Sequence, residues 1–69
     1  MRLSARNRIP ARVVGVTRGE ATANVELDAN GVRLVAAITV EAAEDLGLEP
    51  GREVIAVIKA SDLMLGVDN

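Results

Sequence analysis

The chain has 69 residues, a formal net charge of −2, and no Cys, His, Trp, Tyr or Phe. This composition excludes disulfides, Cys or His zinc sites, thiol or imidazole catalysis, and aromatic stacking on nucleic-acid bases. Apolar residues make up 49% of the chain, which is typical of a globular protein, and we expect residues 1–69 to form a single domain. Because so small a domain has a thin aliphatic core and no covalent or metal staple, the composition favours a homo-oligomer.

The first half of the chain predicts three strands. Residues 9–17 are rich in Val, and Pro10 must stand at the start or on an edge of this strand because it has no N–H to donate. Residues 21–28 alternate apolar and polar side chains, which predicts a strand with one buried face. Asn30 and Gly31 tolerate the positive φ angles of a tight hairpin turn, so we expect residues 32–38 to form the returning strand.

The second half predicts one short helix and two further strands. Thr39 is expected to cap a helix over residues 39–46, and Gly47 is expected to end it in a left-handed conformation. A turn at residues 50–51 precedes an apolar strand over residues 53–60, and residues 62–67 predict a short last strand. This order indicates an all-β fold with one short helix, arranged as a five-stranded OB-like Greek-key barrel.

Charge is distributed unevenly along the chain. Residues 1–12 contain four Arg and no acidic residue, whereas residues 13–69 carry a net charge of −6. A basic segment on an acidic body suggests capture of an anion or docking to an acidic neighbour. The sequence starts without the apolar run of a secretory signal, and its longest apolar run, residues 54–58, is too short to span a bilayer. We therefore expect a cytoplasmic protein with no membrane partner.

Catalysis and nucleic-acid binding both find little support in the sequence. The Ser and Thr hydroxyls have no His partner, and the ten acidic residues are spread along the chain in the manner of a solvated surface. OB barrels often bind oligonucleotides, but this chain has no aromatic ring and an acidic body that repels phosphates. The sequence predicts neither an enzyme nor a nucleic-acid partner.

The remaining chemistry is a set of hydrogen-bond donors suited to a small anion. Arg offers a planar fork, Lys a point charge, and hydroxyls neutral donors, and each charge-assisted hydrogen bond contributes about 1.5–3 kcal/mol. One member of the set, Thr39, stands where a helix start presents free N–H groups. The candidate donors are Ser4, Arg6, Asn7, Thr39, Lys59 and Ser61.

Three segments together resemble a known family. Residues 4–7 (Ser-Ala-Arg-Asn), 37–39 (Ala-Ile-Thr) and 57–62 (Val-Ile-Lys-Ala-Ser-Asp) are similar to the molbindin or Mop family of small cytoplasmic molybdate-binding proteins. The resemblance extends over residues 4–65. It implies OB-like subunits assembled as a hexamer, a trimer of dimers, with molybdate or tungstate at the subunit interfaces. It also implies a role in molybdenum storage or homeostasis, with no cofactor besides this ligand.

The resemblance also assigns individual residues. One subunit is expected to contribute Ser4 and Arg6, and another is expected to line the site with Lys59, Ala60 and Ser61. Thr39 is expected to add a hydroxyl or a backbone donor. Ala5 and Asn7 are supporting residues, since Asn7 is placed to hold the N-terminal arm. No side chain is expected to ligate a metal directly, because molybdenum is bound as molybdate.

The donor set has a chemical reason to prefer molybdate. Molybdate at neutral pH is an unprotonated tetrahedral dianion that only accepts hydrogen bonds, whereas phosphate carries a proton that needs an acceptor. Sulfate is also a pure acceptor, so it must be excluded by its smaller size. Two other functions stay open at this point: a structural or assembly module with a vestigial anion site, and a small OB-type nucleic-acid binder.

Overall fold

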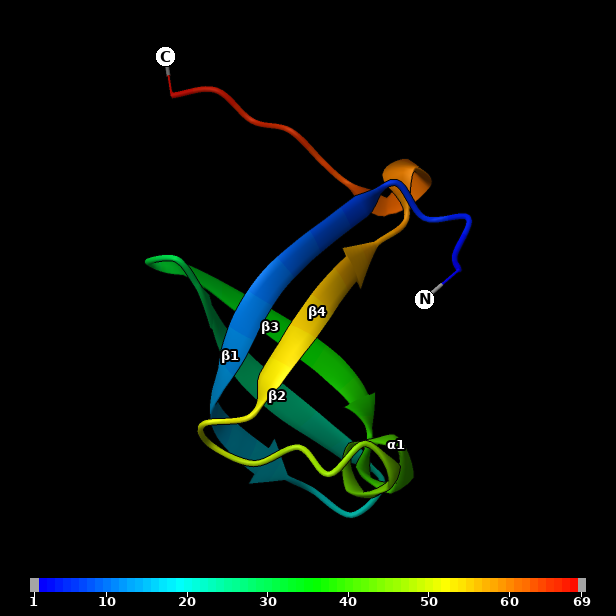
Figure 1. Cartoon of the computed structure of the whole chain (residues 1–69), viewed down its shortest axis with the longest axis vertical. Coiled ribbons are helices and arrows are strands. Elements are labelled where there is room, and N and C mark those ends of the chain that lie inside the picture. The colour runs from blue at the N-terminus through cyan, green and yellow to red at the C-terminus, as the bar shows by residue number, and fades with distance from the viewer. Residues whose placement is uncertain (1, 69) are drawn as a thin grey trace.

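The computed structural model describes residues 2–68 and contains, within them, one antiparallel sheet of four strands and one α-helix (Figure 1). The elements in chain order are β1 Asn7–Arg18, β2 Thr22–Ala29, β3 Val32–Thr39, α1 Val40–Asp45, β4 Glu53–Ile58 and the 3-10 turn η1 Ala60–Asp62. The strand order in the sheet is β3-β2-β1-β4. The predicted all-β fold with one short helix is confirmed.

β1 is long because its two halves pair with different strands. Its first half, from Asn7 to Arg12, pairs with β4, and its second half, from Arg12 to Arg18, pairs with β2. A shift in register between Val13 and Gly15 bends the strand where the partner changes. Pro10 lies in the first half, opposite Ile55 and before the pairing with β2 begins. Its missing N–H therefore leaves the β1–β2 ladder intact.

The turn and cap chemistry follow the sequence. Asn30 and Gly31 have φ angles of 52° and 93° and join β2 to β3, and the Gly31 N–H donates to the Asp28 carboxylate (3.1 Å). The Thr39 hydroxyl accepts from the Ala42 N–H (3.0 Å) at the start of α1. At the other end Gly47 has φ 63°, and the Leu48 N–H donates to the Ala43 carbonyl (3.0 Å). The predicted hairpin, helix cap and helix stop are confirmed.

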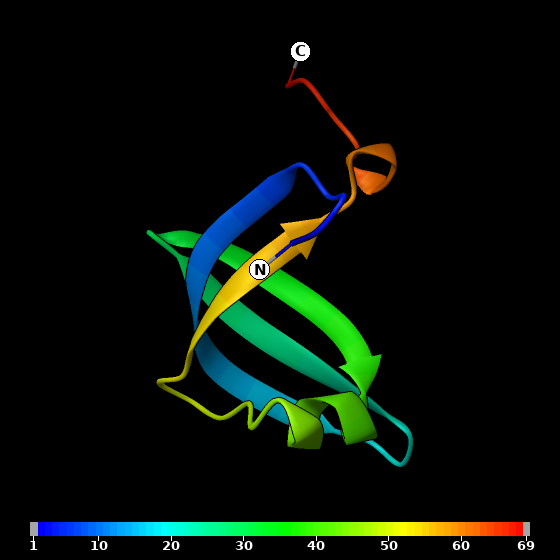
Figure 2. The same cartoon turned by 45° about the vertical axis from the view of Figure 1, so that its right-hand side comes forward.

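The core is aliphatic and small, as the composition predicts. It is formed by the inward-facing residues of β1 and β2 together with the helix and the loop that follows it: Val13, Ala23, Val25, Leu27, Ala43 and Leu48. Ala43 is fully buried because α1 covers one end of the curled sheet (Figure 2). Within residues 2–68 we find no helix long and apolar enough to cross a membrane.

The predicted fifth strand over residues 62–67 is absent from the described part of the chain. β4 ends at Ile58, earlier than the predicted residue 60, and η1 follows, closed by a hydrogen bond from the Asp62 N–H to the Lys59 carbonyl (2.9 Å). This turn directs residues 63–68 away from the sheet (Figure 1), where they have no strand to pair with. In one chain, β3 and β4 thus remain the two edges of an open sheet.

Candidate functional site

The pairing of β1 with β4 brings two of the predicted site segments to one end of the sheet. Asn7 lies opposite Ile58, and its side-chain amide donates to the Ile58 carbonyl (3.0 Å). The segment 4–6 enters the sheet where the segment 59–61 leaves it (Figure 1). The resemblance assigned these segments to different subunits, and the structure shows that they also neighbour each other within one chain. Asn7 thus ties the start of β1 to the end of β4.

The N-terminal arm, residues 2–6, is held by an arginine that the sequence reasoning did not select. The Arg8 guanidinium donates to the Leu3 carbonyl (3.2 Å). The arm and this arginine surround a shallow depression lined by Leu3, Ser4, Ala5, Arg6 and Arg8. Ser4 and Arg6 are exposed, so their donors are free to meet a ligand from solvent. The excess of Arg in residues 1–12 was the signal that could have pointed to Arg8.

The second segment lies on η1. Lys59 has an extended backbone (φ −64°, ψ 135°) and stands directly before the turn, in which Ala60 and Ser61 are the first two residues. All three are exposed. The Lys59 ammonium and the Ser61 hydroxyl therefore lie at the same end of the sheet as Arg6, and add a cation and a hydroxyl to the donors of the arm.

Thr39 does not join this group within one chain. It lies at the end of β3, where it caps α1, and α1 and η1 occupy opposite ends of the molecule in both views (Figures 1 and 2). The cap uses the hydroxyl oxygen as an acceptor for the Ala42 N–H (3.0 Å). A hydroxyl that accepts one hydrogen bond still has its own proton to donate. Thr39 can thus contribute to an anion site formed with the arm only when a second copy presents it.

The positive side chains at the arm end favour an anion, but a single copy leaves that anion exposed to solvent. Arg6, Arg8 and Lys59 are all exposed, with Asp62 as the acidic residue of the adjacent turn. Exposed charges interact weakly in water, because the high dielectric and salt screen them. Charge-assisted hydrogen bonds become strong when the site excludes solvent. A single copy therefore carries the donors of an anion site without the enclosure.

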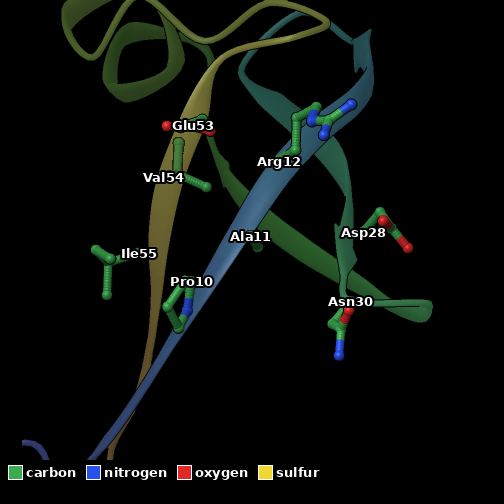
Figure 3. A pocket seen from close by; sticks show the side chains of 8 residues that line it. All are labelled: Pro10, Ala11, Arg12, Asp28, Asn30, Glu53, Val54 and Ile55. Atoms are coloured by element: carbon green, nitrogen blue, oxygen red, sulfur yellow. The ribbon is translucent and has the colours of Figure 1, made fainter.

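Another depression, on the outer side of the sheet, has the wrong chemistry for a dianion. Figure 3 shows Arg12 on β1 with Asp28 and Asn30 from the β2–β3 hairpin and Glu53 at the start of β4. Arg12 lies opposite Asp28 in one ladder and opposite Glu53 in the other. Two carboxylates next to the one cation disfavour a bound oxyanion.

The charge pair between Glu26 and Arg33 lies on the β2–β3 hairpin, apart from the arm. The Arg33 Nε atom is 3.0 Å from a Glu26 carboxylate oxygen. The hydrogen bond and the charge of Arg33 lower the pKa of Glu26 below its ordinary value, and Glu26 in turn raises the pKa of Arg33. Arg33 is largely exposed and Glu26 is partly exposed, so this pair has a local effect on the hairpin.

Taken together, the fold and the arm define a small antiparallel β-domain that gathers cationic and hydroxyl donors at one end of its sheet. Residues 3–65 match the TOBE domain family. Molybdenum-pterin-binding protein 1 of Clostridium pasteurianum is 41% identical over 66 residues, which span 94% of this chain and 97% of that protein.

Solved structures agree with this match. A molybdate-binding protein from Sporomusa ovata superposes with a TM-score of 0.93 at 37% identity, covering 97% of this chain and all of that one. The cytoplasmic molybdate-binding protein ModG, solved with molybdate bound, superposes with a TM-score of 0.92 at 42% identity, and this chain covers 49% of it. The chain belongs to the TOBE domain family and, within it, to the Mop family of molybdenum-pterin-binding proteins.

Proposed function

We propose that this chain binds molybdate or tungstate non-covalently, as a cytoplasmic protein for molybdenum storage or homeostasis, and catalyses no reaction. The observation that carries the proposal is the gathering of the arm and the segment 59–61 at one end of the sheet, fixed by the Asn7–Ile58 pair. The family membership supports the ligand, since the relatives are named for molybdenum-pterin or molybdate binding. ModG, described as cytoplasmic, supports the location.

The proposed site is made entirely of donors. Its members share an exposed position in the single chain and a side chain or backbone group able to donate to an oxyanion: Ser4, Arg6, Thr39, Lys59, Ala60 and Ser61. Ala5 and Asn7 support it by shaping and anchoring the arm. Such a site suits molybdate, which only accepts hydrogen bonds, and offers the proton of phosphate no carboxylate acceptor.

We place the anion at interfaces between copies of the chain. Two observations support this: the donors of one copy are exposed, and Thr39 lies at the opposite end of the same copy. A second copy that presents its Thr39 end to the arm would add a donor and exclude solvent in one step. The proposed assembly is a hexamer, a trimer of dimers, in which residues 1–69 form one domain and the five-stranded barrel is completed.

The deciding experiment is a calorimetric titration of the purified full chain with molybdate, tungstate, sulfate and phosphate. We expect heat with molybdate and tungstate and at least tenfold weaker binding of phosphate, because none of the proposed site residues is a carboxylate that could accept the phosphate proton. The absence of heat with molybdate and tungstate would overturn the proposal. A parallel titration with a fluorescent oligonucleotide tests the alternative nucleic-acid function, and salt-sensitive binding there would favour it.

A further inference from the structure

The N-terminal arm carries two of the proposed anion donors on a stretch of chain without regular secondary structure. Ser4 and Arg6 both lie on bends, and β1 begins only at Asn7. Both donor side chains are exposed. A terminal segment of this kind is ordered only where it is tied to the rest of the fold. The contacts that tie it therefore decide where the two donors stand before an anion arrives.

Two side-chain hydrogen bonds fix the chain on either side of residues 4–6. On the sheet side the Asn7 amide donates to the Ile58 carbonyl (3.0 Å). On the far side the Arg8 guanidinium donates to the Leu3 carbonyl (3.2 Å). In the described part of the chain, this second bond is the one hydrogen bond that we find between the arm and the remaining residues. The three donor-bearing residues are thus a short loop held at both ends.

Arg8 can hold the arm because its own backbone belongs to the sheet. It lies on β1 directly opposite Val57 of β4, and residues in this relation have Cβ atoms about 4.5–5.5 Å apart. Both residues are exposed on the same face of the sheet. The stem of an arginine covers apolar neighbours while its guanidinium reaches into water. The paired strands fix where the Arg8 stem starts, and the guanidinium carries that restraint back to the Leu3 carbonyl.

We infer that Arg8 is a positioning residue of the anion site, which fixes the arm before the anion binds. The inference rests on the proposed function, since it concerns the same site. When a ligand has to order a mobile segment, the lost conformational freedom opposes binding. The apparent affinity then falls in proportion to the fraction of molecules whose segment is already in the binding conformation. The contact between Arg8 and Leu3 raises that fraction for Ser4 and Arg6.

The competing role for Arg8 is a direct contact with the anion. A guanidinium has five N–H donors, and Arg8 also lines the depression formed by the arm. The two roles differ in the protein without anion. A positioning contact orders the arm in that state, whereas a direct contact acts only once the anion is bound. The order of the arm without anion therefore distinguishes them.

The experiment compares two variants that lose the same charge from the same strand. Arg8→Met keeps an aliphatic stem and removes every donor. Arg12→Met is the matched control, because Arg12 is an exposed arginine on the same face of β1. Arg12 lies opposite Glu53, and within the described residues we find no hydrogen bond from it to the arm. Any difference between the variants then reports on the arm contact and not on net charge.

Two measurements are made on the parent and on both variants. Calorimetry with molybdate should show binding about three- to tenfold weaker for Arg8→Met and unchanged for Arg12→Met. NMR relaxation of the backbone amides of residues 4–6, without anion, should give order parameters of about 0.85 in the parent and in Arg12→Met, and below about 0.6 in Arg8→Met. At saturating molybdate the order parameters of the three proteins should converge, because the anion then holds the arm.

Each contrary outcome has a separate meaning. Weaker binding by Arg8→Met with an arm as rigid as that of the parent would assign Arg8 a direct contact and overturn the positioning role. A mobile arm with parent-like affinity would overturn the contribution to binding, and so would a change limited to the thermal midpoint. All three results leave the proposed function in place. A parent that does not bind molybdate would overturn the proposed function, and this inference with it.

Discussion

The two ends of the sheet differ in how completely residues of a single chain cover them. At one end α1 covers the core: Ala43 is fully buried, and both termini of the helix are capped by residues of the same chain. At the other end Ser4, Arg6, Lys59 and residues 63–67 are exposed. The contrast indicates that the α1 end supplies the stability of the single chain and the arm end supplies the surfaces that meet ligand and partner.

The largest effects should come from removing a cation at the arm end. Arg6→Ala and Lys59→Ala should each weaken molybdate binding by about 2–5 kcal/mol, roughly 30-fold to several thousand-fold, because each deletes a charge-assisted contact to an enclosed anion. Calorimetry measures the loss. Arg18→Ala is the matched control, since Arg18 is an exposed arginine at the opposite end of β1. Parent-like binding by both arm-end variants would show that the anion is held elsewhere.

The core at the α1 end should dominate the stability of the chain. Val25→Ala removes two methyl groups from a side chain that is only 1% exposed, so we expect the free energy of unfolding to fall by about 2–3 kcal/mol through lost burial and the cavity that remains. Urea denaturation measures this change. Val32→Ala deletes the same atoms from a side chain that is 59% exposed and should change the unfolding free energy far less. Similar losses in the two variants would mean that the surface around Val32 is covered in the folded protein.

The helix cap offers a smaller test at the same end. Thr39→Ala removes the acceptor for the Ala42 N–H and should lower the free energy of unfolding by about 1 kcal/mol. Thr39→Ser keeps the hydroxyl and should restore most of that stability. If Thr39 also donates to the anion from a second copy, Thr39→Ala weakens molybdate binding as well, and Thr39→Ser retains it. Calorimetry on the two variants separates the capping role from the ligand role.

The sequence predicted well those features of the molecule that are set by residues close together in the chain. The hairpin at Asn30–Gly31, the Thr39 cap and the Gly47 stop each depend on a few consecutive residues, and all three are confirmed. The fate of residues 62–67 depends instead on which edge is available to pair with, and strand propensity carries no information on that. The pattern of apolar residues therefore predicted a strand where the single chain has a turn and an exposed segment.

The candidate site was accessible from the sequence for a different reason. Its residues lie in short motifs, residues 4–7 and 57–62, whose resemblance to a family could be seen without a fold. What the motifs could not reveal was the arrangement: the Asn7–Ile58 pair that joins them in one chain, the Arg8 contact that holds the arm, and the distance of Thr39 from both. The Asn7–Ile58 pair depends on the antiparallel pairing of β1 with β4, which joins residues about fifty positions apart.

The smallest effect should come from the exposed Glu26–Arg33 pair, which belongs to neither end. Because Arg33 lowers the pKa of Glu26 in the folded state, the pair's stabilisation is present above the ordinary carboxyl pKa and is lost as pH falls through the lowered value. Glu26→Gln should therefore differ slightly from the parent in thermal midpoint at neutral pH, and the difference should vanish in acid and shrink in high salt, since exposed pairs are weak and screened. A difference that persisted in acid would have to arise from packing along the hairpin, because the carboxylate charge is then gone in the parent as well.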